Sequence, residues 1–395
     1  MLDAEGSEGS AVECRPPRLS LASLECTLTT ACNLACSYCH QDRPQGRLMS
    51  WAVLQGVIDR LLASEAEERT LALAGGEPVL EWPLVRRAIE YVRESSSNGK
   101  PPAISLTSNG LLLDQEKARF LVEHDVKVQI SLDGIREAHE LRAPGTFDVL
   151  DRLLVRLRRD HPSWYRKRLS VGMTLTSANL PFLARSGEYL LGRGIESLRL
   201  APLLTHDEGW GREADAELER QMGEVFDLCL EHYQRTGAIP LEVFRRPANP
   251  PEARHDRPVC RVNAPETQAV GVDGSVNGCP LLLAQEVGGT QAGSVLREWI
   301  ERPEWPGLRR ERYSSYGRCW DCDFIDECLV CPVASANIPG NTDPRRVPDS
   351  GCAFNRIVGR YRRLFPPVAG PEDHLKGNDP LPTAMTDLAK ALGLG

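Results

Sequence analysis

The chain has 395 residues, of which 41% are hydrophobic and 26% are charged, and these shares are those of a globular protein rather than a fibrous, disordered or membrane-spanning one. Its length exceeds one ordinary hydrophobic core and fits a barrel domain followed by a smaller domain. The formal net charge of −8 argues against a nucleic-acid partner, because phosphate contacts need clustered Lys and Arg, and it favours a small-molecule or peptide substrate.

The N-terminal stretch of residues 1–14 is acidic and polar, and it has neither the basic nor the apolar region of a secretion signal. Nowhere does the sequence contain about 18 consecutive apolar residues, so no membrane-spanning helix is expected. We therefore predict a cytoplasmic protein without a membrane contact. Because the cytoplasm keeps thiols reduced, the 13 cysteines favour metal or cluster ligation over disulfides.

Between residues 20 and 235, short runs of Leu and β-branched residues alternate with longer amphipathic patterns. This alternation predicts parallel strands joined by helices. The expected strands are residues 21–29, 70–76, 103–110, 126–134, 169–176 and 196–203, and two of the expected helices are residues 51–67 and 82–94. Right-handed crossovers would curl six such units into a partial (β/α)6 barrel of the TIM type, an α/β fold whose site gathers at the carboxyl ends of the strands.

A Pro- and Arg-rich segment, residues 239–258, contains few candidate core residues and predicts a linker after the barrel. Most of the cysteines follow this segment, which indicates a separate cysteine-rich domain. The expected parts of the chain are an N-terminal extension at 1–20, the barrel at 21–240, the linker at 241–258, the cysteine-rich domain at 259–356 and a loosely packed tail at 357–395.

Three cysteines, Cys32, Cys36 and Cys39, follow the first expected strand with three and then two residues between them. A short loop with three thiolates can hold three corners of a cubane iron–sulfur cluster. The fourth iron then stays open, and an open coordination position distinguishes a reactive metal centre from a closed structural one. Buried or zinc-binding cysteines are the competing interpretation of this spacing.

The loop, with Tyr38 directly before Cys39, resembles the radical S-adenosylmethionine (SAM) superfamily, and the resemblance extends over the barrel region. It implies a 4Fe-4S cluster whose open iron binds SAM. It also implies that one electron from this cluster splits SAM and yields a 5′-deoxyadenosyl radical, which abstracts a hydrogen atom from the substrate.

Residues at the ends of the next three expected strands match other motifs of that superfamily. Gly75 and Gly76 have no Cβ, so the backbone at these residues can approach a ligand closely. With Glu77 and Pro78 they match the superfamily's GGEP motif, which holds the amino group of SAM. The resemblance implies SAM contacts from Tyr38, Gly75, Gly76, Glu77, Pro78, Ser108, Asn109, Ser131 and Arg142, the last in a stretch that begins at His139 and resembles HDxxR. Each motif alone could be a strand-end cap, whereas their joint order favours a SAM site.

The C-terminal cysteines include two CxxC pairs, which in isolation also suit a zinc site. Together with the element formed by Gly274, four residues and a cysteine, they resemble the SPASM extension of peptide-modifying radical SAM enzymes over residues 259–356. The resemblance implies two auxiliary 4Fe-4S clusters. One would be held by Cys319, Cys322, Cys328 and Cys352, and the other by Cys260, Cys279, Cys331 and a fourth ligand that the sequence does not identify. Only two residues separate Cys328 from Cys331, where the family has three.

Three further features have more ordinary interpretations. Cys26 is expected to be a core residue of the first strand. His206, Asp207 and Glu208 follow the sixth strand and suit either proton transfer at the barrel mouth or, more commonly, an ordinary polar loop. The basic run at 152–168 is expected to be a solvated helix face rather than a binding surface for an acidic peptide.

The substrate is the least determined part of this prediction. Sulfatase-maturing members of the SPASM branch carry Asp where this chain has Pro280, so formylglycine formation is disfavoured. The broader resemblance implies crosslinking or oxidation of a ribosomally synthesised peptide, with flavodoxin or ferredoxin as electron donor. Only about 20 residues precede the first strand, so a separate protein, the barrel surface or the tail is expected to recognise a leader peptide. The alternatives are a radical SAM dehydrogenase or epimerase acting on a sugar or aminoglycoside, and a non-enzymatic zinc or iron–sulfur protein.

Overall fold

The computed structural model describes most of the barrel region and parts of the C-terminal third of the chain. The described residues are 20–39, 46–96, 100–247, 266–281, 283, 319, 322–325, 328, 331–343 and 346–368. Cys14, the predicted ligand Cys260, most of the predicted linker and the tail beyond residue 368 lie outside this part.

The strands are β1 (Ser23–Thr27), β2 (Thr70–Ala74), β3 (Ala103–Ser108), β4 (Lys127–Ser131), β5 (Leu169–Leu175), β6 (Leu198–Pro202), β7 (Arg246–Pro247), β8 (Thr267–Val270), β9 (Val276–Asn277) and β10 (Pro367–Val368). The α-helices are α1 (Trp51–Leu62), α2 (Trp82–Ser95), α3 (Gln115–Glu123), α4 (Arg136–Glu140), α5 (Phe147–Asp160), α6 (Pro162–Arg168), α7 (Leu183–Gly192), α8 (Arg212–Thr236), α12 (Pro332–Ala336) and α13 (Asp349–Arg362). Short 3-10 helices are η1 (Pro78–Glu81), η2 (Leu180–Phe182) and η3 (Glu242–Phe244).

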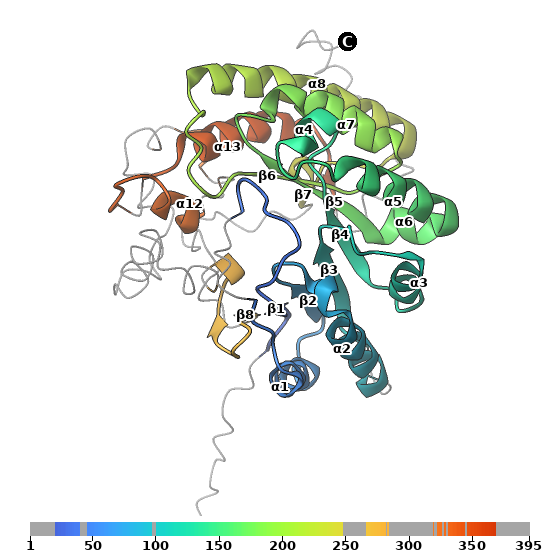
Figure 1. Ribbon diagram of the computed structural model, residues 1–395. Coiled ribbons are helices and arrows are strands. Elements are labelled where there is room, and N and C mark those ends of the chain that lie inside the picture. The colour runs from blue at the N-terminus through green and yellow to red at the C-terminus, as the bar shows by residue number, and fades with distance from the viewer. Residues whose placement is uncertain are drawn as a thin grey trace, which may run out of the picture.

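Strands β1 to β6 are parallel and form a curved sheet in chain order, with the connecting helices along its outer side (Figure 1). Each of these strands lies within its predicted range, and α1 and α2 begin at their predicted residues. The predicted partial (β/α)6 barrel is therefore confirmed. In the described chain, the sheet order β6-β5-β4-β3-β2-β1-β8-β9 shows that β8 and β9 extend the barrel sheet beyond β1, with β8 parallel to β1.

The two faces of the barrel sheet differ in burial because side chains alternate between the faces along each strand. On the outer face, Leu71 and Leu73 of β2 are 0% exposed and belong to the core formed with the helices. On the inner face, Ser105 of β3 is half-buried and Thr107 is exposed. The inner face of the barrel is therefore accessible along part of its length.

Helix α1 shows how the sequence sets the outer layer. Ser50 caps the helix, because its hydroxyl accepts a hydrogen bond from the amide of Val53 at 3.3 Å. The buried residues Leu54, Ile58 and Leu61 recur at helical spacing and face the sheet. This pattern explains why the helix could be placed from the sequence.

The start of the expected linker differs from the expectation of few core residues. Leu241 and Phe244 are 2% and 0% exposed. The Phe244 ring stacks on Phe365 with 5.4 Å between centroids, and Phe226 of α8 lies 5.1 Å from Tyr361 of α13. Such aromatic contacts bury large areas, so they fix α13 against the barrel. Helix α13 also crosses the expected boundary at residue 356.

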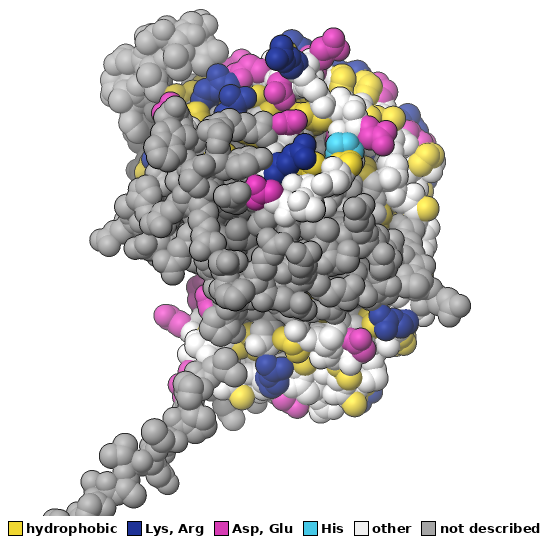
Figure 2. Space-filling view, turned by 90° about the vertical axis from the view of Figure 1, so that its left-hand side faces the viewer, with side chains coloured by type: hydrophobic (Ala, Val, Ile, Leu, Met, Phe, Trp, Pro, Cys, Tyr) yellow, Lys and Arg dark blue, Asp and Glu magenta, His cyan; other side chains and the backbone are white. Residues whose placement is uncertain are grey.

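The described part of the chain has no helix that is long and apolar enough to cross a membrane. On the face shown in Figure 2, described side chains of Lys and Arg are interspersed with those of Asp and Glu. Several arginines of the basic run at 152–168 are engaged within the protein. Arg168 pairs with Asp125 at 2.7 Å and Arg156 donates to the carbonyl of Leu113 at 2.6 Å, so these two side chains are engaged in contacts within the protein rather than fully solvated as expected.

Candidate active site

The loop that carries the first three cysteines, residues 28–39 and here called the cluster loop, begins directly after β1 and is bound to the end of β2. The amide of Gly76 donates to the carbonyl oxygen of Thr29 at 2.8 Å. A Cβ on Gly75 would lie 2.5 Å from that same oxygen, and a Cβ on Gly76 would lie 2.2 Å from the carbonyl oxygen of Ala31. Gly75 also has a φ of 149°, which favours glycine. The close approach that these glycines permit is therefore to the cluster loop itself.

Glu77 joins the ends of β2 and β3. Its carboxylate is 1% exposed and accepts hydrogen bonds from the Ser108 hydroxyl at 2.8 Å, the Asn109 amide at 2.7 Å and the Val79 amide at 3.0 Å. Burial raises the pKa of Glu77, and these three hydrogen bonds offset part of the rise. A carboxylate has about four acceptor positions, so the protein itself uses most of them. Pro78 begins η1 and is buried, as suits the first turn of a helix.

Asn109 links the end of β3 to the cluster loop beside its first cysteine. Its side-chain amide donates to Asn33 Oδ1 at 2.7 Å and lies 4.0 Å from Cys32 Sγ. Its Oδ1 accepts from the amide of Leu111 at 3.1 Å, which fixes the orientation of the side chain. The predicted residues Ser108 and Asn109 thus lie at the cluster loop, and Glu77 holds both in place.

A buried acid, Asp133, connects the cluster loop to the end of β4 and to the helix that follows. It is 2% exposed. It accepts a hydrogen bond from the Tyr38 hydroxyl, one from Arg142 Nη1 at 3.2 Å and one from the Thr174 amide at 2.9 Å. The Arg142 guanidinium also lies over the Tyr38 ring, 5.4 Å from its centroid. The sequence reasoning missed Asp133, although an acid directly after the fourth strand was a usable signal.

Arg142 retains a positive charge at this position. Burial lowers its pKa, but the charges of Asp133, Tyr38 and Cys36 and a hydrogen bond with Cys36 raise it, and the net change is a rise. The side chain is 13% exposed, and within the described residues its Nε–H has no hydrogen-bond partner. A buried cation with an unused donor beside the cluster loop suits an anionic ligand.

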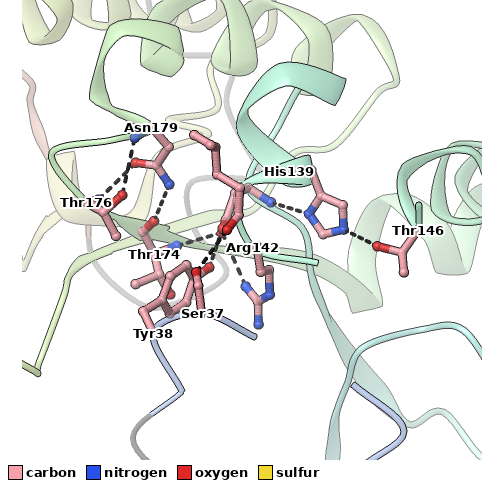
Figure 3. A network of polar contacts seen from close by, with 10 residues as sticks. Ser37, Tyr38, His139, Arg142, Thr146, Thr174, Thr176 and Asn179 are labelled. Atoms are coloured by element: carbon pink, nitrogen blue, oxygen red, sulfur yellow. Dashed lines mark hydrogen bonds and ion pairs between the residues drawn. The ribbon is translucent and has the colours of Figure 1, made fainter. Parts of the chain in front are cut away.

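His139 serves as a support for this network. It is 1% exposed, and its Nδ1 accepts from the Asp133 amide at 3.3 Å. Its Nε2 lies 3.0 Å from Thr146 Oγ1, which donates to the Ala143 carbonyl at 2.6 Å, so Nε2 carries the proton (Figure 3). Burial, aided by the charge of Arg142, lowers the pKa of His139 to about 4. The imidazole is therefore neutral and orients the turn that carries Asp133.

The three cysteines of the cluster loop differ in exposure. Cys32 and Cys36 are half-buried and Cys39 is exposed. The Ser37 hydroxyl donates to the carbonyl of Leu141 at 2.9 Å, which binds the cluster loop to the end of α4. Among the described residues, no three side chains of His, Cys, Asp or Glu converge as ligands of one metal ion.

Ser131 ends β4 on the inner face of the sheet. It is paired in register with Gly172 of β5 and is half-buried. It lies two residues before Asp133, at the carboxyl end of the barrel where the other predicted SAM contacts are found. Its predicted SAM contact stays a prediction.

Four of the C-terminal cysteines lie along a chain of tight turns. The amide of Cys322 donates to the Cys319 carbonyl at 3.3 Å, and the amide of Cys328 donates to the Ile325 carbonyl at 3.3 Å. Cys331 is the N-cap residue of α12, and burial raises the pKa of its thiol.

Two more predicted ligands begin or follow regular elements. Gly274 has a φ of 86° in the turn between β8 and β9, and this turn places Cys279 directly after β9. Cys352 lies in the first turn of α13, where its amide donates to the Pro348 carbonyl at 2.9 Å. Cys26 and Cys229 are 0% and 2% exposed, so Cys26 is the core residue that was predicted.

In the loop after β6, Asp207 has a structural role. Its carboxylate accepts hydrogen bonds from the Ser177 amide at 2.7 Å and from the Ser177 hydroxyl at 2.5 Å. His206 instead lines a cavity of about 450 Å³ between this loop, α12 and the start of α13. Trp210 and Arg346 line the same cavity. The ordinary polar-loop interpretation therefore holds for Asp207.

Comparisons with known proteins identify the barrel. The sequence pattern of the radical SAM superfamily matches residues 26–173. An uncharacterized protein, MJ0907, of Methanocaldococcus jannaschii is 27% identical over 176 residues, 43% of this chain and 59% of that protein. A probable GTP 3′,8-cyclase of Metallosphaera sedula is 26% identical over 58% of this chain and 74% of that protein. A cysteine-type anaerobic sulfatase-maturating enzyme of Clostridium perfringens is 31% identical over 29% of this chain and 33% of that enzyme. The match thus spans less than two thirds of two of these three relatives.

Two solved structures share the fold over most of the chain. Native anSMEcpe with bound AdoMet and Cp18Cys peptide superposes with a TM-score of 0.66 at 17% identity, over 94% of this chain and 99% of that one. SuiB of Streptococcus suis bound to its precursor peptide SuiA superposes with a TM-score of 0.56 at 14% identity, over 84% of this chain and 76% of that one. Residues 26–173 of this chain thus match the radical SAM superfamily, and the fold of the chain is similar to that of anSMEcpe and SuiB.

Proposed function

We propose that this protein uses SAM to modify a ribosomally synthesised peptide, by forming a crosslink or by oxidising a side chain. The match of residues 26–173 to the radical SAM superfamily implies SAM and a 4Fe-4S cluster. The observation that carries the SAM half of the proposal is the buried Arg142, held by Asp133 and Tyr38 beside Cys36 with its Nε–H unused. The peptide half rests on the fold shared with two enzymes whose structures hold peptides.

In this proposal Cys32, Cys36 and Cys39 hold the cluster. When bound, the cluster and SAM supply a radical able to remove a hydrogen atom from an unactivated carbon. Arg142 offers its charge and its Nε–H to the SAM carboxylate, since a charge-assisted hydrogen bond is stronger than a neutral one. Asp133 keeps that guanidinium in place. Because Glu77 already accepts three hydrogen bonds, it acts chiefly by positioning Ser108 and Asn109.

The C-terminal cysteines are proposed to hold two auxiliary 4Fe-4S clusters, with the ligand sets expected from the sequence. Backbone hydrogen bonds between described residues join Cys319 to Cys322 and Ile325 to Cys328, which supports this ligand set. Half-exposed thiols in such a segment suit cluster ligation better than burial in a core. A low-potential one-electron donor, flavodoxin or ferredoxin, is the proposed partner, and a separate protein is proposed to recognise the leader peptide. Oxidoreductase activity is the corresponding enzyme class.

The test of this function is anaerobic reconstitution followed by product analysis. Reconstituted protein, SAM and dithionite should give 5′-deoxyadenosine, and a peptide encoded beside the gene should lose two hydrogens in the mass spectrum. Cys32→Ala should abolish both products, whereas the matched control Cys229→Ala, in the core of α8, should retain them. Absence of 5′-deoxyadenosine from iron-loaded protein would overturn the SAM chemistry and leave the zinc or iron–sulfur binding protein.

A second candidate is a radical SAM enzyme acting on a small molecule. The alignment with the probable GTP 3′,8-cyclase, over 74% of that protein, favours it. This second candidate also includes a radical SAM dehydrogenase or epimerase that acts on a sugar or an aminoglycoside. The two candidates separate in one assay. If GTP or a sugar accelerates 5′-deoxyadenosine formation and is consumed while no peptide is changed, the peptide proposal is wrong.

A further inference from the structure

The sulfur of Cys32 is contacted by a side chain from a distant strand end. Asn109, directly after β3, lies 77 residues further along the chain, and its Nδ2 is 4.0 Å from Cys32 Sγ. The amide of Leu34 donates to the same sulfur at 3.4 Å. Because an amide nitrogen carries two hydrogens, Asn109 can donate one to Asn33 Oδ1 at 2.7 Å and direct the other at the sulfur.

The position of the Asn109 side chain is fixed from both of its ends. The backbone amide of Asn109 donates to Glu77 Oε2 at 2.7 Å, and its Oδ1 accepts from the Leu111 amide at 3.1 Å. The residue is only 8% exposed. Turning the side chain away from the cluster loop would leave buried polar groups without partners, which costs free energy. The contacts of Asn109 therefore hold its donor group toward the loop.

These hydrogen bonds leave Asn109 little capacity for a contact with SAM. Both hydrogens of its Nδ2 face acceptors on the cluster loop, and the Leu111 amide uses one of the two lone pairs of its Oδ1. The SAM contact that the sequence resemblance implies would have only the remaining lone pair. The donor side of Asn109 therefore points to a role toward Cys32.

A donor directed at a ligand sulfur affects an iron–sulfur cluster in two ways. It orients the thiolate, and partners of this kind behind the direct ligands contribute to metal affinity. It also stabilises the negative charge on the cluster and its sulfurs. Because the reduced cluster carries one more electron, this stabilisation is larger in the reduced state, and the reduction potential rises. Low exposure to water strengthens such an electrostatic effect.

We propose that Asn109 is a positioning residue for the cluster held by Cys32, Cys36 and Cys39, and that its hydrogen bond to the Cys32 sulfur raises the reduction potential of this cluster. This role rests on the proposed function and assigns Asn109 to the cluster rather than to SAM. Glu77 acts through Asn109, because it holds the Asn109 backbone. The consequence for the reaction is a cluster that a flavodoxin or ferredoxin reduces more readily.

The experiment is a redox titration followed by electron paramagnetic resonance, with the full-length protein reconstituted under anaerobic conditions. The signal that changes when SAM is added identifies the cluster at the cluster loop. Asn109→Leu keeps the approximate size of the side chain and removes its donor. In this variant the midpoint potential of that signal should shift to a more negative value. The chelator concentration that removes half of the signal should fall about tenfold.

A second variant keeps the test decisive if Asn109→Leu does not fold. Asn109→Asp keeps the shape of the side chain and an acceptor for the Leu111 amide, but it replaces the donor with a negative charge. It should shift the midpoint potential in the same direction and further than Asn109→Leu does. A smaller shift for Asn109→Asp would show that the electrostatic argument is wrong.

Asn179 offers a matched control within the barrel. It is 6% exposed, its Oδ1 accepts from the Thr176 amide at 2.9 Å, and its Nδ2 donates to the Thr174 carbonyl at 2.8 Å. Asn179→Leu thus removes a similarly buried amide whose hydrogen bonds involve no cysteine. This variant should lose stability but keep the wild-type midpoint potential and chelator resistance. An equal shift of the potential in Asn179→Leu would overturn the proposed role of Asn109, because general loosening of the barrel would then explain both.

The remaining outcomes separate this role from the function on which it rests. If Asn109→Leu keeps the wild-type potential while its affinity for SAM, measured by calorimetry, falls tenfold or more, Asn109 is a SAM contact and the role toward Cys32 is wrong. In that case the proposed SAM chemistry stands. If the loaded wild-type protein has no signal that responds to SAM, the proposed function is overturned together with this role.

Discussion

Replacing Asp133 by Asn tests whether a buried ion pair fixes the cluster loop to the barrel. The Asp133 side chain is 1% exposed, that of Arg142 is 13% exposed, and Oδ1 and Nη1 are 3.2 Å apart. Asn has the same shape and still accepts from the Thr174 amide, but it leaves the buried guanidinium without a counter-charge. Removal of one partner from a buried pair costs about 3–5 kcal/mol. We expect that loss in the free energy of unfolding, measured by urea titration with circular dichroism.

The double variant Asp133→Asn, Arg142→Met separates the charge from the packing. Met fills a similar space without a charge, so the double variant should be more stable than Asp133→Asn alone by about 1 kcal/mol or more. The exposed pair Arg185–Glu137, at 3.0 Å, is the control, and Glu137→Gln should change stability little. A double variant less stable than Asp133→Asn would refute the reasoning, because the uncompensated charge would then not be the cause of the loss.

Three other predictions concern the cluster loop, its support and the C-terminal helix. Gly76→Ala should lower the free energy of unfolding by about 2–4 kcal/mol and reduce iron incorporation, because the new Cβ would lie 2.2 Å from a backbone oxygen. Full iron loading of this variant would contradict the prediction. Burial lowers the pKa of His139 from 6.5 to about 4. Between these pH values the unfolded chain therefore binds more protons than the folded chain. The free energy of unfolding should therefore fall by about 3 kcal/mol as pH drops through that window, and His139→Gln should flatten a pH series of urea titrations; an unchanged slope would count against this. Phe244→Ala should lower the free energy of unfolding by about 3–5 kcal/mol, because it leaves a cavity beside Phe365. A loss below about 1 kcal/mol in the same titration would show that the aromatic contacts do not anchor α13.

The strands of the barrel were predictable because their outer residues alternate with inner ones in short, separated runs. Each βα unit carries this signal locally, as Leu71 and Leu73 of β2 show, and no distant contact is needed to interpret it. The cysteine spacing of the cluster loop is equally local. Both features are therefore predictable from the sequence alone.

The segment after α8 shows what composition does not reveal. Pro and Arg residues between 239 and 258 predict a linker, and in the described part of this stretch Arg245 is 13% exposed. Its guanidinium donates to the carbonyls of Ile239 at 2.8 Å, Pro240 at 3.1 Å and Glu196 at 3.2 Å. An arginine that satisfies backbone acceptors at a chain turn is indistinguishable in sequence from a solvated one. Its role depends on a strand end nearly 50 residues away in the chain.

The roles within the SAM motifs were also only partly predictable. The segments that carry Gly75 to Pro78, Asn109 and Arg142 all contact the cluster loop in the structure, and their SAM contacts stay a prediction. The sequence did not reveal that the glycines contact the cluster loop or that Asp133 pairs with Arg142. Both are contacts between segments that are distant in the chain, and spacing within one segment carries no information about them.

The cluster loop takes its shape from two strand ends and a helix end rather than from its own sequence. The end of β2 binds it through Gly76, the end of β3 through Asn109, and the end of α4 through the Leu141 carbonyl. Without these contacts, holding three thiols together on a short flexible segment would cost the full conformational entropy of ordering that segment. The sheet therefore preorganises the ligands before any cluster binds. Iron loading should accordingly depend on contacts such as Asn109–Asn33 that include no cysteine.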